Sequence, residues 1–132
     1  MFLKYNFPAL LWALVIFILT LMPGKYIPPA GIFEILYPDK LVHMAVFAVL
    51  IVLFLFGFLR QDTFRMLRFH PMAIAFTGCV IYGFLLELMQ GTLLADRYFE
   101  ILDAIANAVG CIIGMGVFRF YLKRLSRGTD RS

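Results

Sequence analysis

Four long apolar runs, separated by shorter polar or proline-containing segments, dominate this sequence. They cover residues 7–22, 41–59, 72–90 and 101–122. Each run is close to the ~20 residues that an α-helix needs to cross the hydrocarbon core of a bilayer. Hydrophobic residues make up 63% of the 132 residues, which is too much apolar surface for one small soluble core to bury. The sequence therefore predicts an all-α membrane protein, a bundle of four transmembrane helices.

The four runs and their connections form one unit, and we expect a single domain over residues 1–125. The first run could be read as part of a signal peptide, but it ends in Leu-Met-Pro-Gly-Lys without a small-x-small cleavage site, so an uncleaved helix is favoured. Cys79 and Cys111 lie inside the third and fourth runs, where we expect them to be buried small hydrophobic residues. Residues 126–132 are expected to form a disordered basic tail.

The distribution of Lys and Arg predicts the orientation. If both termini are cytoplasmic, the inner side carries Lys4, Arg60, Arg65, Arg68, Arg119, Lys123, Arg124, Arg127 and Arg131, and the outer side carries Lys25, Lys40 and Arg97. This bias follows the positive-inside rule. We therefore expect a multi-pass membrane protein with its N- and C-termini in the cytoplasm. The same bias accounts for the formal net charge of +4, so binding of nucleic acid is not required.

Polar side chains gather at the helix ends that this topology places outside. They are Asp39, Lys40 and His43 before and in the second run, Glu87 and Gln90 in the third, and Glu100, Asp103 and Asn107 around the start of the fourth. Spacings of three and four residues put the members of each group on one face of their helix. Because ionisable groups are costly in lipid, the three faces are expected to turn toward one another. The pattern predicts an outward-opening polar pocket within the membrane.

Glu87 is the strongest candidate for a functional residue. It lies in the apolar stretch Leu85–Met89, so its charge has to be paired, hydrated or removed by protonation. We expect Glu87 and His43 to act as general acid or base. The expected substrate-binding residues are Asp39, Lys40, Gln90, Arg97, Glu100, Asp103 and Asn107.

Simpler roles stay open for several of these residues. Asp39 is placed to cap the second helix, and Lys40 is long enough to reach the membrane interface. Gln90 and Asn107 are amides of the kind that link transmembrane helices. Glu87 is also compatible with a purely structural interhelical hydrogen bond.

A metal site is a further alternative. Asp39, His43, Glu87 and Asp103 have suitable ligand chemistry, but the sequence has neither an HExxH-like spacing nor a cysteine-rich motif. No metal and no cofactor is therefore expected. The absence of a nucleotide-binding glycine loop or a nucleophile elbow argues against nucleotide-dependent and serine-hydrolase chemistry.

The order and spacing of the polar residues resemble those of the VanZ-like family of small bacterial membrane proteins. The matching pattern reads Asp39-Lys40-x-x-His43 with Phe47 one turn later, Gly83-x-x-x-Glu87-x-x-Gln90, Arg97, and Glu100-x-x-Asp103-x-x-x-Asn107-x-x-Gly110-x-x-x-Gly114. Met44 departs from the family, because an aromatic residue is expected after the histidine in many relatives. The resemblance implies about four transmembrane helices. The founding member of the family is associated with low-level resistance to teicoplanin.

Three classes of function fit these observations. The first is an enzyme acting on a lipid or cell-envelope amphiphile at the outer leaflet, the second a non-catalytic binding or antibiotic-resistance accessory protein, and the third a structural membrane subunit. Catalysis would be abolished by changes as small as Glu87→Gln or His43→Gln in folded protein. Binding would decline gradually over many substitutions, whereas loss of a structural residue would reduce protein abundance.

Overall fold

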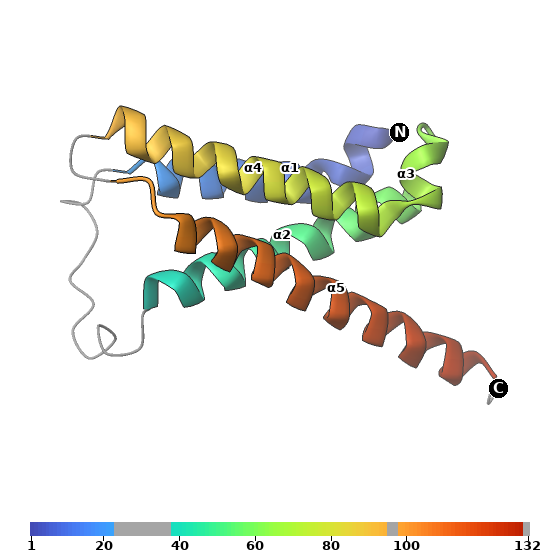
Figure 1. Ribbon diagram of the computed structural model, residues 1–132. Coiled ribbons are helices and arrows are strands. Elements are labelled where there is room, and N and C mark those ends of the chain that lie inside the picture. Colours follow the sequence, from blue (N-terminus) through green and yellow to red (C-terminus); the bar gives the residue numbers. More distant parts are fainter. Residues whose placement is uncertain (23–37, 95–97, 131–132) are drawn as a thin grey trace.

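The computed structural model describes residues 1–22, 38–94 and 98–130, and within these ranges the chain consists of helices joined by short connections (Figure 1). The helices are α1 (Phe2–Thr20), α2 (Pro38–Arg60), α3 (Arg65–Phe69), α4 (Pro71–Leu93) and α5 (Ile101–Thr129). All except the short α3 are long and apolar enough to cross a membrane. The prediction of an all-helical chain with four candidate spans is therefore confirmed, and the protein is described below as a multi-pass membrane protein.

Two helix ends differ from the prediction by five residues or more. α1 begins at Phe2 instead of residue 7, and α5 continues to Thr129, so the stretch expected to be disordered from residue 126 is helical up to that point. Extending an existing helix costs little, because each added residue gains a hydrogen bond, and the Lys, Arg and Leu residues near the end of α5 are good helix formers. Residues 131–132 lie outside the described part of the chain.

α2 is the central helix and packs against each of the other three long helices. α5 crosses α2 obliquely, and its C-terminal part projects beyond the bundle (Figure 1). The crossing is close because glycines face the backbone of α2: a Cβ on Gly110 would lie 2.7 Å from Met44 Cα, and one on Gly114 would lie 2.6 Å from the Ala48 carbonyl oxygen. The small residues of α5 thus permit the close helix approach that their spacing predicts.

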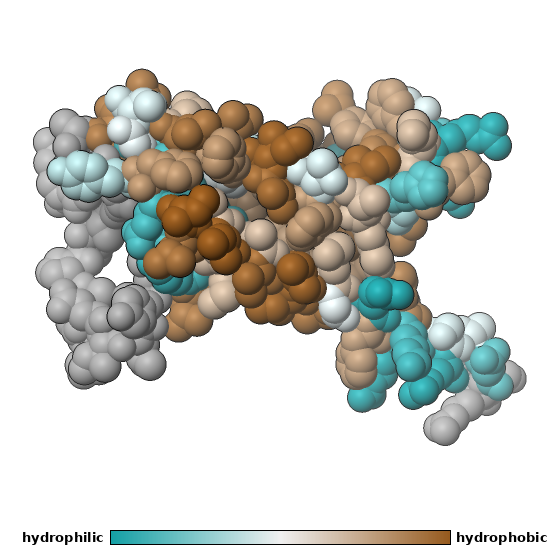
Figure 2. All heavy atoms as spheres, viewed as in Figure 1, coloured by the Kyte–Doolittle hydropathy of each residue, from teal (hydrophilic) through white to brown (hydrophobic). Residues whose placement is uncertain are grey.

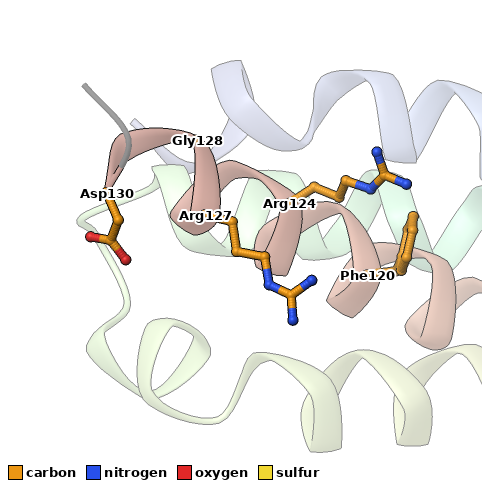
Figure 3. A pocket seen from close by; sticks show the side chains of 5 residues that line it. All are labelled: Phe120, Arg124, Arg127, Gly128 and Asp130. Carbon is orange, nitrogen blue, oxygen red and sulfur yellow. The ribbon is translucent and has the colours of Figure 1, made fainter.

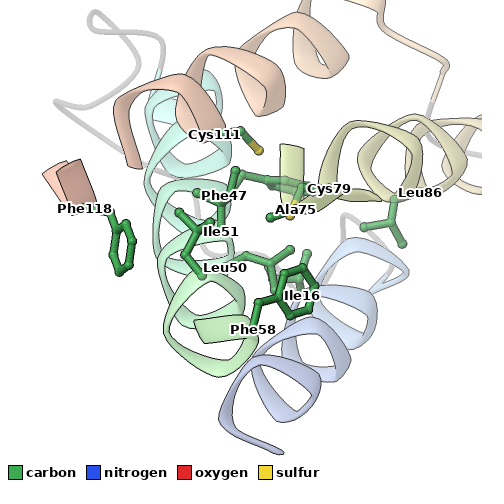
Figure 4. Packing of buried hydrophobic residues seen from close by; sticks show 11 residues of the cluster. Ile16, Phe47, Leu50, Ile51, Phe58, Ala75, Cys79, Leu86, Cys111 and Phe118 are labelled. Carbon is green, nitrogen blue, oxygen red and sulfur yellow. The ribbon is translucent and has the colours of Figure 1, made fainter. Parts of the chain in front are cut away.

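The hydrophobic core is built around α2 (Figure 4). Phe47, Leu50 and Ile51 of α2 are essentially inaccessible and pack among residues of the other long helices. Cys79 and Cys111 belong to this core as free, buried thiols, as expected. Because lipid is as apolar as these side chains, the packing is stabilised mainly by dispersion contacts and close fit rather than by exclusion of water.

The outer surface is apolar between two polar ends (Figure 2). Large hydrophobic side chains point outward along this band, among them Leu14, Ile18, Leu85, Ile112 and Val117. A soluble monomer rarely exposes a continuous apolar surface of this extent. Four helices that face lipid require such an apolar band on their outer surface.

Candidate functional site

Three helix ends meet at one end of the bundle: the N-termini of α2 and α5 and the C-terminus of α4 (Figure 1). A set of polar side chains near these ends comprises His43 of α2, Glu87 of α4, and Asp103 and Asn107 of α5, and we call these four residues the polar cluster. The two carboxylates and the amide are at most 5% exposed. The convergence of three polar helix faces expected from the sequence is therefore present.

The imidazole of His43 stands between the acidic and amide groups. Its Nδ1 lies 2.9 Å from Asn107 Oδ1, a distance at which an Nδ1–H donates to the amide oxygen. This hydrogen bond selects the tautomer whose Nε2 is free of the proton, and Nε2 lies 3.9 Å from Asp103 Oδ2. Glu87 Oε1 is 3.7 Å from Nδ1. One imidazole is thus within reach of two buried carboxylates.

Lys40 connects the polar cluster to the surface. Its Nζ lies 2.8 Å from Glu100 Oε1 and 3.3 Å from Asp103 Oδ1. Side-chain exposure falls from 49% at Glu100 through 26% at Lys40 to 6% at Asp103. The ion pair with Glu100 is worth little in stability, because solvent screens the two charges. The position of Lys40 matters more, because its ammonium group contacts both the accessible Glu100 and the buried Asp103.

The backbone contributes to the geometry of the polar cluster. Asp103, Asn107 and Gly110 are four and three residues apart, which places them on one face of α5, and the close contact of Gly110 with α2 brings that face toward His43. On α4, a Cβ at Gly83 would lie 3.0 Å from Asn107 Nδ2. Asp103 is in the first turn of α5, where the helix dipole favours a carboxylate by roughly 0.3–1 kcal/mol.

The described side chains at this end of the bundle include three carboxylates, those of Glu87, Glu100 and Asp103, and one ammonium group, that of Lys40. His43, Glu87 and Asp103 each offer one ligand atom, and these atoms lie within 4.8 Å of one another. The cluster can therefore hold a proton or a cation between its members.

Three residues predicted to bind substrate are placed differently or not described. Gln90 is buried, and its Nε2 donates to the Thr20 carbonyl oxygen at 2.7 Å, so this hydrogen bond ties α4 to the end of α1. Asp39 lies at the start of α2, but its side chain is outside the described part of the structure, as is the whole of Arg97. Lys40, Glu100, Asp103 and Asn107 lie where the helix faces were expected to bring them.

Two buried amides near the opposite end were not predicted. Gln61 and Asn6 are fully buried. Gln61 exchanges hydrogen bonds with the backbone of Phe64, donating from Nε2 and accepting at Oε1, both at 2.7 Å. Asn6 Nδ2 donates to the Phe2 carbonyl oxygen at 3.0 Å. The sequence did contain a signal for Gln61, which follows the second apolar run closely. Helix ends often need a side-chain partner for their free carbonyl groups.

A hollow of about 630 Å³ lies beside the C-terminal part of α5 (Figure 3). It is lined by Phe120, Arg124, Arg127, Gly128 and Asp130. The guanidinium carbon of Arg124 lies 5.1 Å from the centre of the Phe120 ring, a cation–π contact. The hollow shares no residue with the polar cluster and lies toward the other end of α5, so the two are separate features.

Comparisons of the chain with protein-family models, with curated proteins and with solved structures give no match. The resemblance to the VanZ-like family thus stays a prediction from the sequence. The conclusions below about function depend on the geometry of the polar cluster.

Proposed function

We propose that this chain is a VanZ-like protein of the bacterial cytoplasmic membrane that acts on a lipid or cell-envelope amphiphile at the outer leaflet. The observation that carries this proposal is the meeting of His43, Glu87 and Asp103 from three helices within a span of 4.8 Å. Helix association alone does not need a histidine between two buried carboxylates, because uncharged amides can serve that purpose at lower desolvation cost.

The surroundings of the polar cluster support an amphiphile as the ligand. The cluster lies near the ends of α2, α4 and α5, whose outer surfaces are apolar and would contact acyl chains. Lys40 is half-buried between the surface and the cluster and would attract an anionic head group. A ligand with a charged head and an apolar tail would contact Lys40 and the apolar helix surfaces at the same time.

The chemistry available is proton transfer. Glu87 and His43 would exchange a proton with a group on the ligand, while Asn107 holds the imidazole in one tautomer. Positioned acid–base groups accelerate reactions by about 10²–10⁴-fold. A non-catalytic binding protein would use the same contacts without requiring a change of protonation.

The test is to purify the protein with its surrounding lipid and to identify retained amphiphiles by mass spectrometry. We expect the wild type to retain one class of anionic amphiphile, and Lys40→Ala to retain at least ~10-fold less of it, as for loss of a charge-assisted contact. Asp62→Asn is the matched control, because Asp62 is 80% exposed and paired only with Arg68 among the contacts described for it. An identical lipid profile in all three proteins would contradict the proposal.

The identified amphiphile then separates catalysis from binding. Incubation with Glu87→Gln should leave retention nearly unchanged and reduce conversion by about 10²-fold or more if the residue is a general acid or base. Retention without any conversion by the wild type would assign the chain to the binding class. Loss of folded protein in Glu87→Gln, with no retained ligand in the wild type, would favour the structural role.

We further propose the topology with both termini in the cytoplasm, on the basis of nine Lys and Arg against three. Both native cysteines are buried, so single engineered cysteines can be read against a low background. In intact cells, an impermeant thiol reagent should label a cysteine at the exposed Thr92 and leave one at the exposed Asp62 unlabelled. The reverse labelling pattern would invert the orientation.

A further inference from the structure

We propose that His43, Glu87 and Asp103 together bind one divalent transition-metal ion. This inference rests on the proposed function in one respect: the bound ion would face the head group of the amphiphile. The three residues lie on three helices and far apart in the sequence, which is why no local metal-binding spacing is present.

The distances suit an ion better than direct hydrogen bonds. Zn²⁺ bonds to imidazole nitrogen and carboxylate oxygen are about 2.0–2.2 Å long, so two ligands of one ion lie about 3–4 Å apart. His43 Nε2, the ring nitrogen that does not face Asn107, lies 3.9 Å from Asp103 Oδ2. One ligand atom from each of His43, Glu87 and Asp103 lies within 4.8 Å of the other two. The separation of 3.9 Å between Nε2 and Oδ2 exceeds the usual 2.7–3.2 Å of a hydrogen bond.

The neighbours of the three residues are arranged as around known metal ligands. A metal-binding histidine almost always donates its other ring N–H to an oxygen, and Asn107 Oδ1 lies 2.9 Å from His43 Nδ1. Lys40 lies against Oδ1 of Asp103, whereas the other carboxylate oxygen, Oδ2, faces the imidazole. The Lys40 contact therefore orients Asp103 without occupying the oxygen that would bind the ion.

Burial points the same way. Glu87 and Asp103 are nearly inaccessible, at 1% and 5% exposure. Buried carboxylates in proteins are paired with cationic groups or coordinate metal ions.

The ligand set selects the kind of ion. One imidazole nitrogen with carboxylate oxygens suits Zn²⁺, Mn²⁺ or Fe²⁺, whereas Ca²⁺ and Mg²⁺ prefer oxygen ligands alone. The thiols of Cys79 and Cys111 belong to the hydrophobic core and do not contribute to the three-residue group. A bound ion of this kind would polarise a phosphoryl or carbonyl oxygen of a head group or activate a water molecule.

The test measures the ion itself. Protein purified through a tag without histidines is stripped with EDTA and titrated with Zn²⁺, with Mn²⁺ in a second series, and the metal retained after dialysis is quantified by mass spectrometry. We expect about one ion per chain in the wild type, and Zn²⁺ binding weaker by at least ~10–100-fold in His43→Gln, Glu87→Gln and Asp103→Asn.

Matched controls come from the same chain. His70→Gln removes the other of the two histidines, and Asp62→Asn removes an exposed acid; neither residue belongs to the polar cluster. Both should bind Zn²⁺ as the wild type does. If the two controls lose binding as strongly as the cluster variants, or if the wild type binds no ion of either kind, the proposal is wrong.

A second measurement does not depend on the folding of any variant. Zn²⁺ added to the stripped wild type should raise its thermal unfolding midpoint, and X-ray absorption should show nitrogen and oxygen neighbours including imidazole. Sulfur neighbours, or no shift in the midpoint at saturating Zn²⁺, would overturn the site. Lipid analysis of the same samples separates the two proposals: amphiphile retained without metal contradicts this inference alone, and metal without amphiphile contradicts only the proposed function.

Discussion

The two ends of the bundle bury polar side chains for different purposes. Gln61 is an uncharged amide, and its partners are backbone groups of Phe58 and Phe64, three residues away on either side. In the polar cluster, by contrast, His43 and Asn107 are 64 residues apart, and the groups around them are ionisable. A side chain that completes the local backbone needs no charge, so the charged groups of the cluster call for a different explanation, and we propose that a ligand or an ion is that explanation.

The largest effect is expected where the polar cluster depends on close helix packing. Gly110→Ala places a Cβ against the backbone of Met44, which cannot move as a flexible side chain would, so we expect a loss of about 1–3 kcal/mol in the free energy of unfolding. The variant should also lose amphiphile retention, because α5 carries Asp103 and Asn107. Stability is measured by denaturant titration in detergent micelles.

The matched control for this substitution is Gly116→Ala on the same helix. A Cβ at Gly116 meets nothing within 4 Å, so only the helix propensity changes, and stability should rise by up to about 1 kcal/mol. Equal destabilisation by both substitutions would show that α5 does not approach α2 as closely as described.

A smaller effect is expected at the opposite end. Gln61→Ala removes the partner of the Phe64 N–H and should cost about 1–3 kcal/mol, toward the lower part of that range because water can reach the partly buried connection. Amphiphile retention per folded molecule should be unchanged. Loss of retention at full stability would break the distinction between the two ends, because the amide would then act on the ligand site.

The smallest effect on stability is expected for an exposed ion pair at the end of the bundle opposite the polar cluster. Arg68 and Asp62 form an ion pair at 2.6 Å whose side chains are 59% and 80% exposed. Arg68→Ala should change stability by about 0.2–1 kcal/mol, and less in high salt. A change comparable to that of Gly110→Ala would mean that this pair holds the connection between α2 and α4 far more strongly than a solvated pair can.

Hydropathy predicted the four spans because the length of an apolar run is a local property of the sequence. The meeting of His43, Glu87 and Asp103 was also predictable, since the cost of exposing such groups to lipid leaves few alternatives. The partner of Gln90 was not predictable, because Glu87 and Gln90 share a helix face and only the position of α1 decides which neighbour each one meets. The continuation of α5 beyond residue 122 was missed for a different reason: hydropathy marks where a helix leaves the membrane, not where it ends.

A continuous α5 has a mechanical consequence. Its 29 residues form a rod about 44 Å long, and its tight crossing with α2 lies near Gly110 and Gly114. A rod held at that crossing acts as a lever with a short arm of roughly 14 Å toward Asp103 and a long arm of roughly 26 Å toward Thr129. Moving the far end by about 2 Å would shift Asp103 by about 1 Å, enough to misalign a reacting group. We therefore expect a force applied to Arg124 or Arg127, near the far end, to change the geometry around His43.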